Sequence, residues 1–141
     1  MSGEFIDSNV FVYLFDETDD HKRGIAQRLV NNALSTRTGV ISYQVVQETL
    51  NVMLCKLPSP VTVPDSQYFL QKVMRPLWRV MPSNGLYQTS IDIQGRYQYG
   101  FYDSLIIAAA LDAGCTRLFT EDMQAGQSID GLVIDNPFLP L

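Results

Sequence analysis

The sequence feature that most constrains the fold is an apolar run at residues 105–111, in which no side chain is polar. A helix formed by this run shows apolar surface on every side, so it must be buried on most sides. Asp103 and Ser104 precede the run and are suited to cap the start of a helix, and Gly114 is suited to a left-handed cap at its end. We therefore expect a central helix, and we interpret Asp103 as a cap residue unless other parts of the chain supply functional partners.

The length of the chain predicts one domain, residues 1–141, with a single core that buries roughly two-thirds of the unfolded surface. No apolar run approaches the roughly 20 residues that span a membrane, and the first residues show no signal peptide pattern. We therefore expect a cytoplasmic protein without a membrane partner. Cys55 and Cys115 are expected to be buried free thiols, although a bridge between them remains open at this point.

The formal net charge of −5 bears on the partners of the chain. An acidic balance argues against a large nonspecific nucleic-acid surface, but it permits a local basic rim. It also agrees with a site that contains several carboxylates and needs a cation to neutralise them.

Short β-branched or aromatic segments alternate with helical patterns along the chain, which indicates an α/β protein. We predict a three-layer sandwich in which helices flank a mainly parallel sheet of short strands. The expected strands are residues 4–9, 39–42, 77–81, 117–120 and 132–134, and the expected helices are 10–15, 22–34, 43–57, 65–73, 84–97 and the apolar run. The carboxyl edge of such a sheet is where ligands bind, and polar residues end several of these strands.

Four carboxylates are expected at this edge, namely Asp7, Glu48, Asp103 and Asp122. Carboxylates that crowd together raise one another's pKa unless a divalent cation lies among them. Ligation by oxygen alone suits Mg²⁺ or Mn²⁺, which can align a phosphodiester, lower the pKa of a water and stabilise the charge of the transition state. The lone histidine, His21, is interpreted as a surface residue, and this chemistry does not require it.

Each carboxylate also has a purely structural interpretation. Asp7 can be a turn residue at the end of a strand, and Asp122 can be a loop residue that faces water. Glu48 lies outside the main apolar arc of its helix, which is typical of a solvated face. Its neighbours along the same stripe, Val52 and Cys55, are uncharged, and this suits a helix that borders a cleft.

Five short motifs occur in order and carry a resemblance to a known family. They are residues 5–10 (FIDSNV), 42–48 (SYQVVQE), 101–106 (FYDSLI), 120–123 (TEDM) and 136–138 (NPF). Through these motifs the sequence resembles PIN-domain ribonucleases, and among them most closely the VapC-type toxins of bacterial toxin–antitoxin pairs. The resemblance extends over essentially the whole chain.

The resemblance implies a PIN-like fold in which Asp7, Glu48, Asp103 and Asp122 bind Mg²⁺ or Mn²⁺, with Asn9 and Thr120 as polar support. It also implies an RNA substrate, a homodimer, and an antitoxin whose C-terminal segment covers the active site. The sequence departs from its relatives at Ala125, where they often carry a histidine or a basic residue. This departure affects the expected substrate contacts of the loop at residues 122–126 but not the metal site.

Our leading hypothesis is a metal-dependent endoribonuclease that acts as the toxin of a type II toxin–antitoxin pair. One alternative is a catalytically silent binding module on the same fold. Another is a phosphohydrolase of the haloacid dehalogenase type, in which a strand-end aspartate such as Asp7 is the nucleophile. That family places a second aspartate two residues later, where this chain has Asn9.

Overall fold

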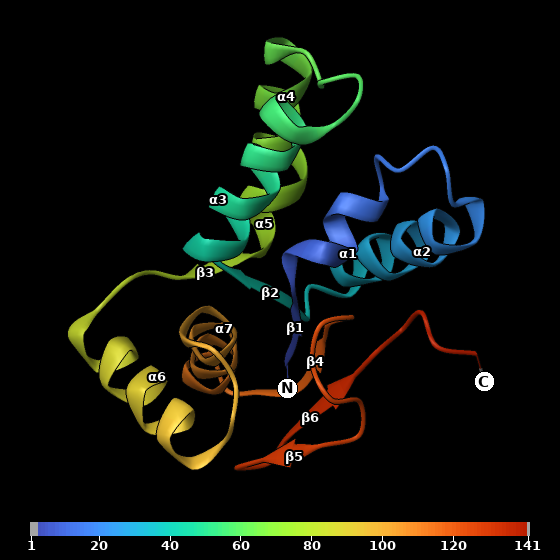
Figure 1. Cartoon of the computed structure of the whole chain (residues 1–141). Coiled ribbons are helices and arrows are strands. Elements are labelled where there is room, and N and C mark those ends of the chain that lie inside the picture. Colours follow the sequence, from blue (N-terminus) through green and yellow to red (C-terminus); the bar gives the residue numbers. More distant parts are fainter. Residues whose placement is uncertain (1–2, 141) are drawn as a thin grey trace.

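The computed structural model describes residues 3–140, and these residues form a six-stranded sheet flanked by helices (Figure 1). The strands lie in the order β3-β2-β1-β4-β6-β5, and all neighbours are parallel except β5 and β6. Their bounds are β1 (Gly3–Ile6), β2 (Gly39–Ser42), β3 (Trp78–Val80), β4 (Cys115–Phe119), β5 (Ser128–Ile129) and β6 (Leu132–Asp135). The predicted mainly parallel α/β fold is therefore confirmed.

Helices cover both faces of this sheet, and three layers result. In Figure 1, α6 and α7 lie on one side of the strands, α1 and α2 lie on the other, and the segments from α3 to α5 extend beyond the sheet as an arm. The helical bounds are α1 (Ser8–Tyr13), α2 (Asp20–Thr36), α3 (Tyr43–Asn51), η1 (Val52–Lys56), α4 (Val63–Phe69), η2 (Leu70–Met74), α5 (Arg75–Leu77), α6 (Asn84–Arg96) and α7 (Phe101–Asp112), where η marks π-helical turns.

The register of the two central strands decides where the polar residues emerge. Ile6 of β1 lies opposite Phe119 of β4, and the N–H of Asp7 donates to the carbonyl oxygen of Phe119 at 3.0 Å. The strands therefore end side by side. As a result, Asp7 and Thr120, which are far apart in the sequence, leave the sheet next to each other at its carboxyl edge.

The predicted central helix is α7, and its side chains from Ser104 to Ala110 are all buried. Its start differs from the prediction, because α7 begins at Phe101 with Gly100 as the N-cap. Asp103 lies within the first turn and does not cap the helix. Gly114 follows the helix with a φ of +73°, the left-handed conformation expected after a helix end.

None of the helices in residues 3–140 combines the length and apolar character needed to cross a lipid bilayer, α7 included.

The arm differs from the prediction at its second helix, which was expected to end at residue 73. The helical segment instead continues to Leu77, directly after the π-helical turn η2. Pro76 lies two residues after this π-helical turn and has no N–H to donate to it. The strand expected next forms as β3, so the deviation is local.

The two cysteines are both free thiols, as expected. Cys115 is buried, but Cys55 is exposed, so the prediction that both are buried was wrong for Cys55. The reason is the orientation of η1, which turns Met53 into the core and leaves Cys55 on the outer face.

Gly39 is needed where α2 crosses β2, and its replacement should destabilise the fold. A Cβ atom at this position would lie 2.5 Å from the Cβ of Ala33 and 3.0 Å from Cδ2 of Leu77. Ala33 has no flexible end that can move away, so α2 itself must shift. We expect Gly39→Ala to lower the free energy of unfolding by about 1–3 kcal/mol, as overpacked cores do.

Urea denaturation measures this loss, and Gly85→Ala in α6 is the matched control. No heavy atom lies within 4 Å of a Cβ added at Gly85. The control should keep or slightly raise stability, because alanine favours a helix more than glycine does. Equal stability of Gly39→Ala and the parent protein would show that α2 does not press on β2 as described.

Candidate active site

Asp7 occupies the centre of the candidate site and is almost completely buried, with 4% of its surface exposed. It is also the N-cap of α1. One oxygen, Oδ1, accepts from the backbone N–H of Ser8 at 2.7 Å, and the other, Oδ2, accepts from the Thr120 hydroxyl at 2.8 Å. Both oxygens are therefore held in fixed directions.

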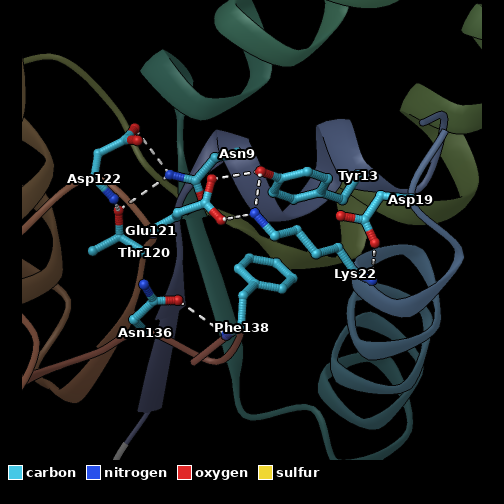
Figure 2. A network of polar contacts seen from close by, with 9 residues as sticks. All are labelled: Asn9, Tyr13, Asp19, Lys22, Thr120, Glu121, Asp122, Asn136 and Phe138. Carbon is cyan, nitrogen blue, oxygen red and sulfur yellow. Dashed lines mark hydrogen bonds and ion pairs between the residues drawn. The ribbon is translucent and has the colours of Figure 1, made fainter. Parts of the chain in front are cut away.

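Asn9 and Thr120 connect Asp7 with Asp122. Figure 2 shows the part of this network that joins Asn9 to Thr120 and Asp122. Nδ2 of Asn9 donates to Oδ2 of Asp122 at 3.0 Å and to Oγ1 of Thr120 at 3.2 Å. The backbone N–H of Asp122 also donates to Oγ1 of Thr120 at 3.2 Å. The structure thus places Asn9 and Thr120 between the two carboxylates, where the resemblance expected polar support.

Glu48 lies in the second turn of α3 and is half-buried. Its Oε1 accepts a hydrogen bond from the hydroxyl of Ser8 at 3.2 Å, which brings it to the same edge as Asp7. The interpretation of Glu48 as a fully solvated residue is therefore wrong. Ser8 was not predicted as a site residue, but it follows Asp7 directly, and its hydroxyl lies 3.4 Å from Oδ1 of Asp7 as well as 3.2 Å from Oε1 of Glu48.

Asp103 is half-buried in the first turn of α7. A second residue that the sequence interpretation missed, Gln44, links this helix to α3. Nε2 of Gln44 donates to the carbonyl oxygen of Tyr102 at 3.2 Å, and the Gln44 amide is close enough to Glu48 to lower the pKa of that carboxyl. Gln44 is buried one turn before Glu48, so the helical spacing of the two residues was the available signal.

Burial and mutual repulsion raise the pKa of three of the carboxylates. The pKa of Asp7 rises to about 7, first because burial disfavours the charged form and then because Glu48 and Asp122 are negative, although hydrogen bonds from Thr120 and Ser8 oppose the rise. Burial also raises the pKa of Glu48, with further contributions from Asp103 and Asp122. The pKa of Asp103 is raised by burial and by the charge of Asp122. Asp122 therefore acts on each of the other three predicted carboxylates, and Glu48 lies close to both Asp7 and Asp103.

The donor set decides which cofactor the site can accept. All four candidate ligands are carboxylates, whose oxygens suit Mg²⁺ or Mn²⁺ rather than zinc. In the part of the chain that the structure describes, no three Asp, Glu, His or Cys side chains are arranged to hold a metal ion together. Mg²⁺ is often bound through one or two carboxylates and several waters. The site thus fits an ion that keeps much of its water.

A family model for the PIN domain matches residues 5–126, which is most of the chain. The chain belongs to the PIN-domain family. The match includes all four carboxylates of the site, and it confirms the family that the sequence motifs had indicated. It ends before residues 136–138, so the last of the five motifs lies outside the matched region of this PIN-domain chain.

Solved structures of toxins from bacterial toxin–antitoxin systems share the fold of this PIN domain. VapC20 from Mycobacterium tuberculosis, described as a sarcin-ricin loop cleaving toxin, has a TM-score of 0.61 and 17% identity over 85% of this chain and 92% of its own. VapBC2 from Rickettsia felis, bound to promoter DNA, has a TM-score of 0.66 and 18% identity, and the match covers 94% of this chain and 97% of the VapBC2 chain. FitAcB from Neisseria gonorrhoeae has a TM-score of 0.65 and 14% identity, and the match covers 96% of this chain and 98% of the FitAcB chain.

At these identities the likeness establishes the fold and not the activity. Among curated proteins, no sequence gives a significant match.

Proposed function

We propose that this PIN-domain protein is a metal-dependent endoribonuclease that hydrolyses RNA phosphodiesters and acts as the toxin of a type II toxin–antitoxin pair. The observation that carries the proposal is the meeting of Asp7, Glu48, Asp103 and Asp122 at one edge of the sheet, where burial and neighbouring carboxylates raise the pKa of Asp7, Glu48 and Asp103. Such a cluster is costly for a fold unless a cation uses it. The fold shared with a toxin that cleaves the sarcin-ricin loop supports RNA as the substrate.

The side chains divide the proposed chemistry between them. Asp7 and Asp122, which Thr120 and Asn9 hold in place, bind the cation. When bound, Mg²⁺ or Mn²⁺ supplies positive charge that stabilises the phosphoryl oxygens in the transition state. Glu48 and Asp103 remain to orient the attacking water, and the raised pKa of Glu48 suits it to accept the proton of this water.

The partners follow from the same family membership. An antitoxin is supported by the structural neighbours, several of which were solved as toxin–antitoxin complexes. We also propose a homodimer and a cytoplasmic location, in which free thiols such as those of Cys55 and Cys115 are expected.

The dehalogenase alternative loses its support at Asn9. That family places a second aspartate two residues after the nucleophile. Here Asn9 provides an amide whose nitrogen already donates to Asp122 and Thr120. Asn9 therefore has a structural task that connects two carboxylates.

Removal of the metal tests the proposed function. Purified protein with Mg²⁺ or Mn²⁺ should cut total RNA into fragments with defined ends, and excess EDTA should reduce the rate to background. Added Mn²⁺ in excess over EDTA should restore cleavage, since the ion supplies much of the transition-state stabilisation. Cleavage that persists in EDTA would contradict metal dependence, and Mn²⁺ binding without any cleavage would indicate a silent binding module.

A further inference from the structure

An ion pair lies beside the candidate site and joins it to α1 and α2 (Figure 2). Nζ of Lys22 contacts Oε2 of Glu121 at 2.7 Å and donates to the Tyr13 hydroxyl at 3.1 Å. The Tyr13 hydroxyl in turn donates to Oε1 of Glu121. Both oxygens of the Glu121 carboxylate are therefore held by side chains from the helices that cover this face of the sheet.

Glu121 stands between two residues of the site, and this is why its anchoring matters. It follows Thr120, which donates to Asp7, and precedes Asp122. Its own backbone N–H donates to Oδ1 of Asn9 at 3.3 Å. The segment 120–122 is thus fastened on two sides, by the site residues on one and by the Lys22 ion pair on the other.

The C-terminal motif at residues 136–138 covers this ion pair. The ring of Phe138 packs edge-on against the ring of Tyr13 with 4.8 Å between centroids, and Nζ of Lys22 lies 5.8 Å from the Phe138 centroid. Oδ1 of Asn136 accepts from the N–H of Phe138 at 3.0 Å and fixes this turn. The side chains of Lys22 and Glu121 are only 30% and 27% exposed. Partial shielding from water makes an ion pair a firmer constraint than a pair at an open surface.

We propose that Lys22 and Tyr13, covered by Phe138, form a clamp on Glu121 that positions Asp122 for cation binding. The inference rests on the proposed nuclease function and assigns positioning roles to residues outside the four carboxylates. Lys22 also neutralises Glu121, so this fifth carboxylate does not add to the repulsion at the site. The clamp also assigns a role to the motif at 136–138, which contains none of the four carboxylates: its Phe138 covers the ion pair.

Lys22→Met tests the clamp, and Arg23→Met is its matched control. Arg23 lies on the same helix and pairs with Asp20 at 2.6 Å, within α2 itself. We expect Lys22→Met to weaken Mn²⁺ binding in calorimetry by about tenfold and to lower kcat for RNA by a similar factor, as loss of a residue that orients a metal ligand does. KM for RNA should stay within about twofold, because the clamp positions a ligand and does not bind substrate. Arg23→Met should change none of these values.

Rescue separates positioning from a general loss of structure. In Lys22→Met/Glu121→Gln the unpaired carboxylate is removed, and Tyr13 can still donate to the amide oxygen of the new glutamine. Lys22→Arg keeps the charge. Both should recover Mn²⁺ affinity and kcat to within about threefold of the parent protein, the coupling expected for residues in direct contact. The melting temperature of each variant is the control. If all variants melt at the same temperature, a general loss of structure cannot explain the loss and recovery of Mn²⁺ affinity.

Amide hydrogen exchange keeps the inference testable if the nuclease proposal fails. Lys22→Met should speed exchange at Glu121 and Asp122, while Arg23→Met should not. If the parent protein neither binds Mn²⁺ nor cuts RNA, the proposed function is refuted and exchange alone decides whether the clamp exists. If Lys22→Met matches Arg23→Met in metal affinity, kcat and exchange, the clamp is refuted whatever the parent protein does.

Discussion

Asp103→Asn should lower the rate of RNA cleavage by at least about a hundredfold while the protein stays folded, which is the loss expected when an acid–base or metal-binding carboxylate is removed. Asp103 is half-buried in the first turn of α7, and its pKa is raised by burial and by the charge of Asp122. No hydrogen bond contributes to the shift of this pKa, and an amide has nearly the same shape, so the substitution should leave the fold intact. Initial rates of cleavage, with fragment ends mapped, measure the effect.

Asp112→Asn is the matched control, because Asp112 is exposed at the other end of the same helix. It should keep the parent rate and the parent cleavage ends. If Asp103→Asn cuts RNA as fast as Asp112→Asn and at the same ends, then the carboxylate at the start of α7 has no part in the chemistry. The nuclease proposal would then need another site.

The positions of the carboxylates could be predicted because they depend on local pattern and on topology. Asp7 follows an apolar strand segment, and a parallel sheet brings its carboxyl strand ends to one edge. The pairing of Ile6 with Phe119 then places Asp7 beside Thr120. No knowledge of side-chain contacts was needed for this step.

The start of α7 was predicted wrongly because cap preference was given too much weight. Asp103 and Ser104 are good N-cap residues, but Gly100 takes that place and the aromatic residues at 101 and 102 form the first turn. Intrinsic preferences are weak compared with burial, and Phe101 packs against the hydrophobic core. The predicted role of Asp103 as a helix cap was therefore wrong, but its predicted place at the edge of the sheet was right.

Contacts between distant segments could not be predicted from spacing. Lys22 and Glu121 are far apart in sequence, and neither stands in a pattern that points to the other. The short strand β5 was missed for a related reason, since two residues cannot show a period and its pairing with β6 is formed only in the folded chain. The residues that support the site therefore required the structure.

Asp7→Asn should abolish cleavage and at the same time stabilise the metal-free protein at alkaline pH. The folded-state pKa of Asp7 is about 7, against an ordinary value of 3.8, chiefly because burial disfavours its charge. Between these two values the folded chain binds more protons than the unfolded chain. Stability therefore falls as pH rises through this window, and the loss is complete above pH 7.

The size of this loss follows from the difference between the two pKa values. A rise from 3.8 to about 7 corresponds to a loss on the order of 4 kcal/mol, at roughly 1.4 kcal/mol for each pH unit. Asparagine carries no charge, and its oxygen can still accept from the N–H of Ser8. Urea denaturation in EDTA should therefore show Asp7→Asn to be more stable than the parent protein at pH 8 and similar to it at pH 4.

A bound cation should reverse this order, because it favours the charged form of Asp7. Mn²⁺ should raise the stability of the parent protein at pH 8 by ligand linkage and should have little effect on Asp7→Asn. The stability order without metal and the effect of Mn²⁺ together show whether Asp7 belongs to a metal site with repelling charges or is a buried structural aspartate. If Asp7→Asn is the less stable protein at pH 8 without metal, the Asp7 carboxylate stabilises the fold through its hydrogen bonds to Ser8 and Thr120, and the crowded charge at this edge is not the reason for its presence.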